Sequence, residues 1–186
     1  MTVDALVEDA KTRMDKSVEA MRHELTGVRT GRASAALLDR IQVDYYGTRT
    51  PLNQLAQISV SDARLLTITP YDKSAIKEIE RAVLESDLGL NPANDGNVVR
   101  LPIPQLTEDR RKELVKVARH IAEEGRIAVR NVRRDALHHL KDLDRAGDAQ
   151  ADEVHRAEDR VQKLTDEHVK RIDDTLKGKE AEILEV

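Results

Sequence analysis

The sequence RIAVRNVRRD, residues 126–135, lies in the middle of a long alternation of apolar and charged residues. At roughly 100° per residue, the apolar positions around it fall on one stripe of a helix, as expected where a helix faces a core. The stripe consists of Leu114, Val117, Ala118, Ile121, Ala128, Val132, Ala136, Leu140 and Leu143. We therefore predict one long helix that is capped by Thr107 and ended by Gly147.

Arginines occupy one flank of this stripe, whereas acidic residues gather on another part of the polar face. The flank contains Arg119, Arg126, Arg130 and Arg133. Planar guanidinium groups bind phosphate oxygens in pairs, so a row of them is typical of a phosphate-binding surface. The arginines can equally pair with acids of neighbouring helices, and the pattern alone leaves both interpretations open.

Two further segments have the same helical period. The first stripe consists of Val3, Val7, Ala10, Met14, Val18, Met21, Leu25 and Val28, and the last of Val154, Ala157, Val161, Leu164, His168, Ile172, Leu176 and Ile183. A single helix cannot bury its own stripe, so the three helices are expected to pack as a nearly parallel bundle. Their length makes this bundle a rod.

Between the first and second helices the apolar period changes to that of strands. Short alternating runs lie at residues 41–45, 57–60, 65–69 and 98–101, with a short helical pattern at 72–86. We therefore predict an α+β fold: an elongated three-helix bundle, residues 1–30 and 106–186, with an inserted small β/α/β domain, residues 31–105.

An inserted domain has two connections to its host, and their compositions differ. One is Thr30-Gly31-Arg32, with a permissive glycine, and the other contains Pro102, Pro104 and Gln105, where prolines disfavour helix. We expect these two segments to form a hinge, with a rigidly packed boundary as the alternative.

Composition narrows the possible functions. The chain has no cysteine, which excludes disulfides and cysteine nucleophiles, and its first residues do not form a signal peptide. No apolar run is long enough for a membrane span, so we expect a cytoplasmic protein without membrane contact. The net charge of −4 does not suggest a nucleic-acid binder, although the charge is unevenly distributed.

Catalytic and cofactor motifs are missing from the sequence. There is no phosphate-binding loop or nucleophile elbow, and the adjacent His138 and His139 project about 100° apart on a helix, unlike a metal-binding pair. We expect no enzyme activity, no metal and no cofactor. Since the bundle has no aromatic residue for base stacking, RNA binding by the rod would use phosphates and RNA shape.

Several runs of sequence carry a family resemblance over nearly the whole chain. They are RTGRAS (29–34), LLDRIQVDYYGTRTPLNQLA (37–56), PYDKSAIKEIE (70–80), SDLGLNPANDG (86–96), LTEDRRKELVK (106–116), VRNVRRDA (129–136) and VQKLTD (161–166). Together they resemble the ribosome recycling factor family. The resemblance implies an L-shaped molecule with the outline of a transfer RNA. It also implies a monomer that, with elongation factor G and its GTP hydrolysis, splits post-termination ribosomes into subunits.

The resemblance also implies partners and binding residues. In the family the bundle binds ribosomal RNA of the large subunit, and the small domain faces elongation factor G; DNA is not a partner. The matching positions for RNA are Arg133, with Arg130 and Arg134 in the same run, and Arg29 at the first hinge strand; Arg126 and Arg119 extend the row. Leu137-His138 departs from the family pattern. A helical adaptor or chaperone that grips proteins is the alternative function.

Overall fold

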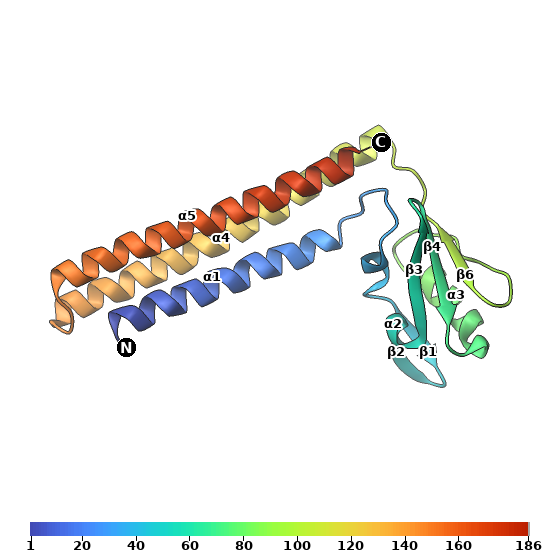
Figure 1. The fold of residues 1–186 in the computed structure, drawn as a ribbon, viewed down its shortest axis with the longest axis horizontal. Helices are drawn as coiled ribbons and strands as arrows, with labels where there is room; N and C mark the ends of the chain where they lie inside the picture. The colour runs from blue at the N-terminus through green and yellow to red at the C-terminus, as the bar shows by residue number, and fades with distance from the viewer. Residues whose placement is uncertain (186) are drawn as a thin grey trace. The chain divides into compact units, whose positions relative to one another are not determined.

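The computed structural model describes residues 1–185. These residues form two compact units, one made of Met1–Val28 and the chain from Lys112 onward, the other of Arg29–Arg111 (Figure 1). The first unit is a helical bundle and the second a small sheet domain. The α+β class predicted from the sequence is therefore confirmed, whereas the L-shaped arrangement stays a prediction.

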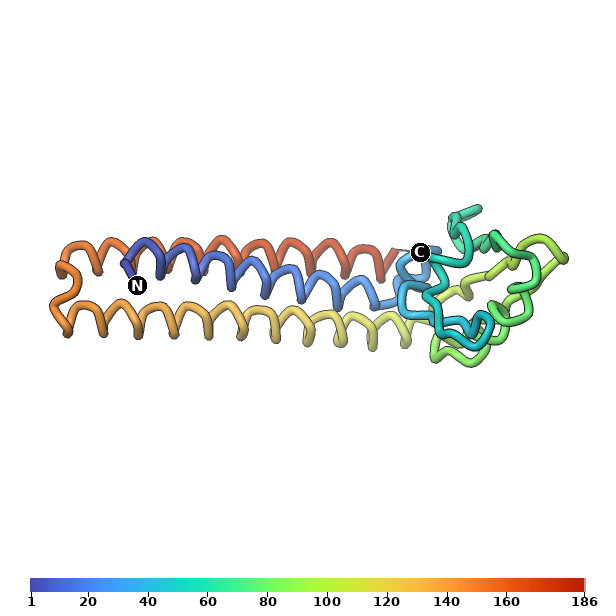
Figure 2. Tube along the Cα trace, turned by 90° about the horizontal axis from the view of Figure 1, so that it is seen from below, coloured from blue at the N-terminus to red at the C-terminus, as the bar shows by residue number. Residues whose placement is uncertain are grey.

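Three long helices make up the bundle: α1 (Val3–Thr26), α4 (Glu108–Ala146) and α5 (Ala151–Leu184). They lie side by side in two perpendicular views, with α1 and α5 running in one direction and α4 in the other (Figures 1 and 2). Among residues 1–185, no helix is both long and apolar enough to cross a bilayer.

The helix ends follow local sequence signals. The Thr107 hydroxyl accepts a hydrogen bond from the Arg110 N–H at 3.2 Å, which satisfies one free donor at the start of α4. Gly147 takes φ +74, a conformation that side-chain-bearing residues rarely adopt, directly after α4 ends. Both ends of α4 were predicted correctly.

The buried face of α4 is rotated from the predicted stripe. Val117 is 47% exposed, and Ile121, Ala128 and Leu143 are only half-buried. The observed core positions are Leu114, Val115, Ala118, Ala122, Gly125, Val129, Val132, Ala136 and Leu140. From Ala118 to Ala136 they recur at alternating intervals of four and three, as in a coiled coil, and Leu140 follows after a further four residues. The true stripe therefore lies closer to the arginine flank.

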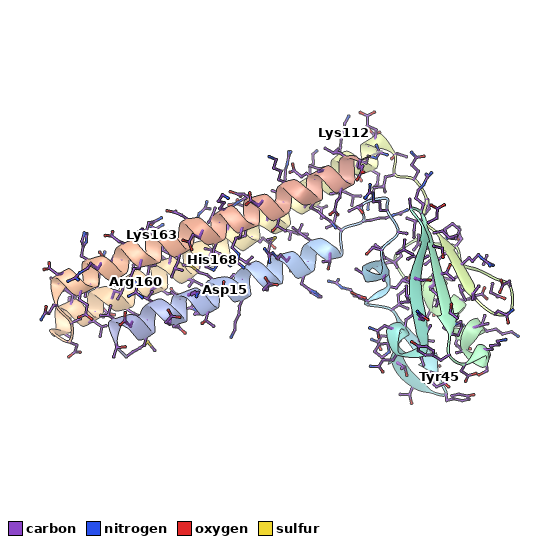
Figure 3. All side chains as sticks on the ribbon, viewed as in Figure 1. Asp15, Tyr45, Lys112, Arg160, Lys163 and His168 are labelled. Atoms are coloured by element: carbon purple, nitrogen blue, oxygen red, sulfur yellow. The ribbon has the colours of Figure 1, made fainter. Side chains whose placement is uncertain are left out.

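The other two stripes are largely as predicted. Every predicted position of α1 is buried, together with Leu6. In α5, Leu164 and Leu176 are half-buried, while Thr165 is buried and donates its hydroxyl proton to the Val161 carbonyl at 2.8 Å. The buried His168 of α5 lies beside Asp15 of α1, with 2.7 Å between Nε2 and Oδ1 (Figure 3).

The small unit contains two antiparallel sheets. Its elements are η1 (Ala35–Leu38), β1 (Gln42–Tyr45), β2 (Thr48–Pro51), α2 (Leu52–Leu55), β3 (Ala56–Asp62), β4 (Leu65–Pro70), η2 (Lys73–Ala75), α3 (Ile76–Glu85), β5 (Ala93–Asn94) and β6 (Val99–Pro102). Strands β1 and β2 form a hairpin, and the larger sheet has the order β3-β4-β6-β5. The amphipathic α3 contributes Ile76, Ile79 and Val83 to the core of this unit.

The sequence predicted β1, β3, β4, β6 and the helical segment of η2 and α3, but not the short elements. The missed elements are η1, β2, α2 and β5. They have two to four residues each, too few to show a period, and β2 reads Thr-Arg-Thr-Pro with no buried residue.

Candidate nucleic-acid interface

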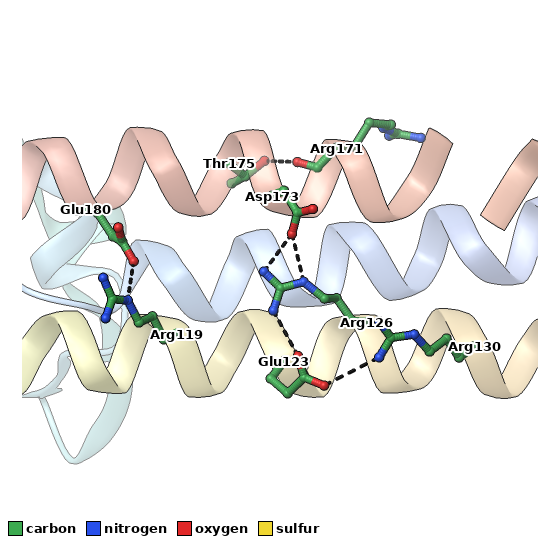
Figure 4. Close-up of polar contacts among 8 residues, drawn as sticks. All are labelled: Arg119, Glu123, Arg126, Arg130, Arg171, Asp173, Thr175 and Glu180. Carbon is green, nitrogen blue, oxygen red and sulfur yellow. Dashed lines mark hydrogen bonds and ion pairs between the residues drawn. The ribbon is translucent and has the colours of Figure 1, made fainter. Parts of the chain in front are cut away.

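The predicted row of arginines on α4 falls into two groups with different partners (Figure 4). Arg119 donates from Nε to Glu180 Oε1 at 2.7 Å, and Arg126 donates from Nε to Asp173 Oδ1 at 2.8 Å. Both acids lie on α5. Of the two interpretations of the arginine row, these two arginines therefore fit pairing with acids of a neighbouring helix.

Arg126 is the more fully engaged of the two. Its Nη2 is 2.6 Å from Asp173 Oδ1, its Nη1 donates to Glu123 Oε2 at 2.9 Å, and its side chain is only 18% exposed. Burial by itself lowers the pKa of Arg126, but the hydrogen bonds with Asp173 and Glu123 outweigh it and raise the pKa. Arg119 uses Nε alone in this way and is 63% exposed, so its outer nitrogens remain accessible.

These pairs follow an antiparallel seven-residue register. Arg119 and Arg126 are seven residues apart on α4, and their partners Glu180 and Asp173 are seven residues apart in the opposite direction on α5. One step further brings Asp166 to the level of Arg133. Asp166 instead accepts from the Gln162 amide at 2.9 Å, and Arg133 has no hydrogen bond or ion pair within residues 1–185.

The remaining arginines belong to an open basic surface. Arg130 is 3.5 Å from Glu123, and Arg134 donates to the Asn131 side chain at 3.1 Å, so both bond only within α4. Around them is a shallow hollow of about 480 Å³, lined by Arg130, Asn131, Arg133, Arg134, Leu137, His138 and Lys141. We call these seven residues the α4 basic surface. With four permanent cations and no acid among them, its charge favours an anion.

A second basic cluster, within the small unit, was only partly predicted. Arg29 donates from Nη2 to the Pro104 carbonyl at 2.9 Å, while the Nε atoms of Arg29 and Arg111 are buried without a hydrogen-bond partner in residues 1–185. Burial, followed by repulsion from Arg110, lowers the pKa of Arg29. A buried N–H without a hydrogen-bond partner is costly, so an incoming anion that accepts from these Nε atoms would be stabilised here.

Arg110 and Arg111 were missed in the sequence. The available signal was their position in the first turn of α4, where the helix dipole favours acids rather than cations. Two arginines in that turn oppose the helix dipole, and the buried Nε of Arg111 has no hydrogen-bond partner in residues 1–185, which is a reason to consider this turn for anion binding.

The predicted hinge residues differ in how firmly they are held. Gly31 has φ +77, in keeping with its predicted role as a permissive position. Pro102 is the last residue of β6 and lies opposite Leu65, and the following Ile103 donates its N–H to the Arg64 carbonyl at 2.8 Å. Pro102 is thus part of the sheet, whereas the Pro104 carbonyl accepts a hydrogen bond from Arg29 Nη2.

Comparisons with known proteins give the family. Residues 21–184 match the family model described as ribosome recycling factor. The chain belongs to the ribosome recycling factor family. It is 56% identical over 180 residues to the ribosome-recycling factor of Rubrobacter xylanophilus, with 97% of each chain covered, and 55% identical to that of Bacillus subtilis, covering 97% of this chain and 98% of the relative.

Solved structures of recycling factors have the same fold. A solution structure of the ribosome recycling factor aligns with a TM-score of 0.80 and 41% identity, covering 100% of this chain and 99% of that one. Models for the T. thermophilus ribosome recycling factor and the E. coli elongation factor G bound to the E. coli post-termination complex align with a TM-score of 0.70 and 47% identity, covering 99% and 100%.

The histidines within residues 1–185 do not gather into a metal site. His138 lies 3.5 Å from Asp142, one turn along the same helix, and the His138 and His139 rings are 6.1 Å apart. Residues 1–185 contain no cluster of three or more histidine or acidic side chains able to hold a metal.

Proposed function

We propose that this recycling factor binds the large ribosomal subunit through ribosomal RNA and, with elongation factor G and that partner's GTP hydrolysis, separates post-termination ribosomes into subunits. The proposal draws on family membership and on the solved neighbour described together with elongation factor G on a post-termination complex. In this proposal the protein acts in the cytoplasm and catalyses no reaction of its own.

The observation that supports RNA binding most strongly is the unpaired state of Arg133. An acid lies at its level in the antiparallel register, yet that acid bonds to Gln162 and leaves the guanidinium open. A purely structural arginine row would use Asp166 as it uses Asp173 and Glu180. We assign phosphate contact first to Arg133, Arg130 and Arg134.

Arg119, Arg126 and Arg29 take different places in this proposal. Arg119 can contact RNA while it keeps its bond to Glu180, because only Nε is used. Arg126 would have to give up bonds from all three nitrogens, so we assign it to bundle stability. Arg29 would act with Arg111, whose Nε is likewise unpaired.

The mechanism must be mechanical, meaning that the factor acts through binding alone. Binding shifts the equilibrium between intact and split ribosomes only if the factor has different affinities for the two states. The factor must therefore bind the split or strained ribosome more tightly than the intact one. The sequence has no nucleotide-binding motif, so the GTPase partner supplies irreversibility. Movement of the small domain about Thr30-Gly31-Arg32 and Pro104-Gln105 would give the shape change.

Co-sedimentation with purified large subunits tests this function against the alternative of a protein-gripping adaptor. The proposal expects the wild-type protein to pellet with large subunits at low salt and Arg133→Ala to pellet far less. Arg126→Ala serves as the matched control, because it removes the same charge seven residues away on the same row, at an arginine whose nitrogens are bonded within the bundle. Failure of the wild-type protein to pellet would overturn the proposal and favour the adaptor.

A further inference from the structure

Tyr46 presents an aromatic ring to solvent at the turn of the β1–β2 hairpin. It is 80% exposed, although the whole chain has only three aromatic residues of the Phe, Tyr and Trp kind. Its neighbour Tyr45 is half-buried against the core of the small unit (Figure 3). An exposed large aromatic side chain loses the benefit of burial, and such rings are common at binding surfaces.

Tyr46 contacts its own unit through its hydroxyl and through the ring of Tyr45. The Tyr46 and Ser74 hydroxyls are 3.4 Å apart, and Tyr45 donates its hydroxyl proton to Asp72 at 2.9 Å. Asp72 also accepts from the N–H and the hydroxyl of Ser74. The two tyrosine rings are in edge contact, with centroids 4.6 Å apart. The Tyr45 hydroxyl is thus occupied internally, and most of the Tyr46 side chain remains exposed.

The backbone of this turn would suit another residue better. Tyr46 has φ +50, the only positive φ at a non-glycine position in residues 1–185, and Gly47 follows with φ +78. These two residues connect the paired Tyr45 and Thr48. A two-residue turn with both φ angles positive strongly prefers Asn-Gly, so the aromatic ring is kept despite a backbone cost, which points to function.

One exposed cation lies beside the ring, and a second lies on the other face of the hairpin. Lys73 is next to Ser74, whose hydroxyl contacts that of Tyr46, whereas Arg49 lies on β2 opposite Asp44, on the hairpin face away from Tyr45. Both are exposed and make no ion pair or hydrogen bond within residues 1–185. An apolar protein side chain on the ring would leave the charge of Lys73 unpaired, whereas a nucleotide has both a flat face and a phosphate.

We propose that Tyr46 is a stacking platform for an unpaired base of RNA, with Lys73 beside it to pair with an adjoining phosphate. The bundle has no aromatic residue, so this platform adds a mode of RNA contact that the α4 basic surface lacks. The inference rests on the proposed function only for the source of the RNA, which is ribosomal; the binding itself is a property of the small unit.

Proton NMR of the full chain, titrated with a short single-stranded oligoadenylate, tests the platform directly. Three tyrosines give a simple ring-proton spectrum. We expect the Tyr46 ring protons to move upfield as adenine stacks, and Tyr46→Asn to weaken oligoadenylate binding by roughly tenfold, the loss of one stacked base. Tyr46→Phe should bind as the wild type does, because it retains the ring.

Tyr46→Asn separates folding from binding, because Asn-Gly is the preferred sequence for this turn. Its unfolding midpoint should be at least that of the wild type. Leu84→Ala, at a 60% exposed position on α3, should change nothing. The Arg133→Ala variant should still show the upfield shift of the Tyr46 ring protons. Failure of RNA binding by the α4 basic surface would therefore be distinguished from failure of the platform. Unmoved Tyr46 resonances at high oligoadenylate, or wild-type affinity in Tyr46→Asn, would overturn the inference.

Discussion

Arg126 of α4 and Asp173 of α5 form a two-pronged ion pair, in which Nε and Nη2 approach the same carboxylate oxygen at 2.8 and 2.6 Å. The pair joins two helices, and Glu123 of α4 accepts a further hydrogen bond from Arg126 Nη1. It divides an apparently uniform arginine row into residues that join helices and residues that face outward, and the two groups should respond differently to substitution.

Arg126→Ala should lower the free energy of unfolding of the bundle by about 1–2 kcal/mol, because a largely buried, charge-assisted bond is lost and Asp173 remains unpaired. Urea denaturation followed by circular dichroism measures this change. Arg130→Ala is the control, since its only bond is a 3.5 Å contact within α4, and it should alter stability little. Equal effects of the two substitutions would contradict the division.

Alanine should destabilise the bundle at Gly125 and should not destabilise it at Gly178. A Cβ at Gly125 would lie 2.9 Å from Cγ of Met21, so Gly125→Ala should cost about 1–2 kcal/mol through overpacking, despite the better helix propensity of alanine. At Gly178 of α5 nothing lies within 4 Å, and Gly178→Ala should gain up to about 1 kcal/mol. Thermal unfolding of both variants checks the contrast; stabilisation by Gly125→Ala would show that the helices are less tightly packed there.

Acid should weaken the contact between α1 and α5. Hydrogen bonds from His168 and then Arg171 lower the pKa of Asp15 below its ordinary 3.8. A carboxylate with a depressed pKa stabilises the fold fully above its unfolded value, and this contribution is lost as pH falls through the folded value. The stability difference between wild type and Asp15→Asn should therefore shrink below pH 3.8. If urea titrations give the same stability difference between wild type and Asp15→Asn above and below pH 3.8, the depressed pKa of Asp15 does not contribute to stability.

Gly31→Ala should strain the first connecting strand, because φ +77 costs a side-chain-bearing residue about 1–2 kcal/mol. We expect lower stability of the small unit and slower subunit splitting with elongation factor G. Asn tolerates this conformation better, so Gly31→Asn should be milder. Stability and splitting are measured on the same preparations; wild-type splitting in both variants would argue against a hinge at this position.

Local signals were enough to predict much of the bundle from the sequence. Thr107 and Gly147 mark the ends of α4 because capping depends on neighbouring residues alone. The buried His168 occupies a position that its apolar neighbours also predict. Val117 was misplaced because the predicted stripe was centred on Leu114, which lies at one edge of the buried face rather than at its middle.

Contacts between helices were harder to predict than the helices themselves. The angle of Arg126 on its own helix does not specify which residues of α5 lie opposite. A signal was nevertheless present: Asp166, Asp173 and Glu180 repeat every seven residues, as Arg119, Arg126 and Arg133 do in the opposite direction. That pattern predicts pairing for all three arginines, and only the structure identifies Arg133 as the unpaired one.

The equilibrium binding of wild-type protein and Arg133→Ala to purified large ribosomal subunits, measured over a range of salt concentrations, tests the central claim most directly. The account predicts wild-type affinity that falls steeply with salt, and an Arg133→Ala variant that is equally stable, binds more weakly by roughly 1–3 kcal/mol and has a salt slope smaller by about one. Equal affinity of the two proteins, or wild-type binding that is insensitive to salt, would contradict it.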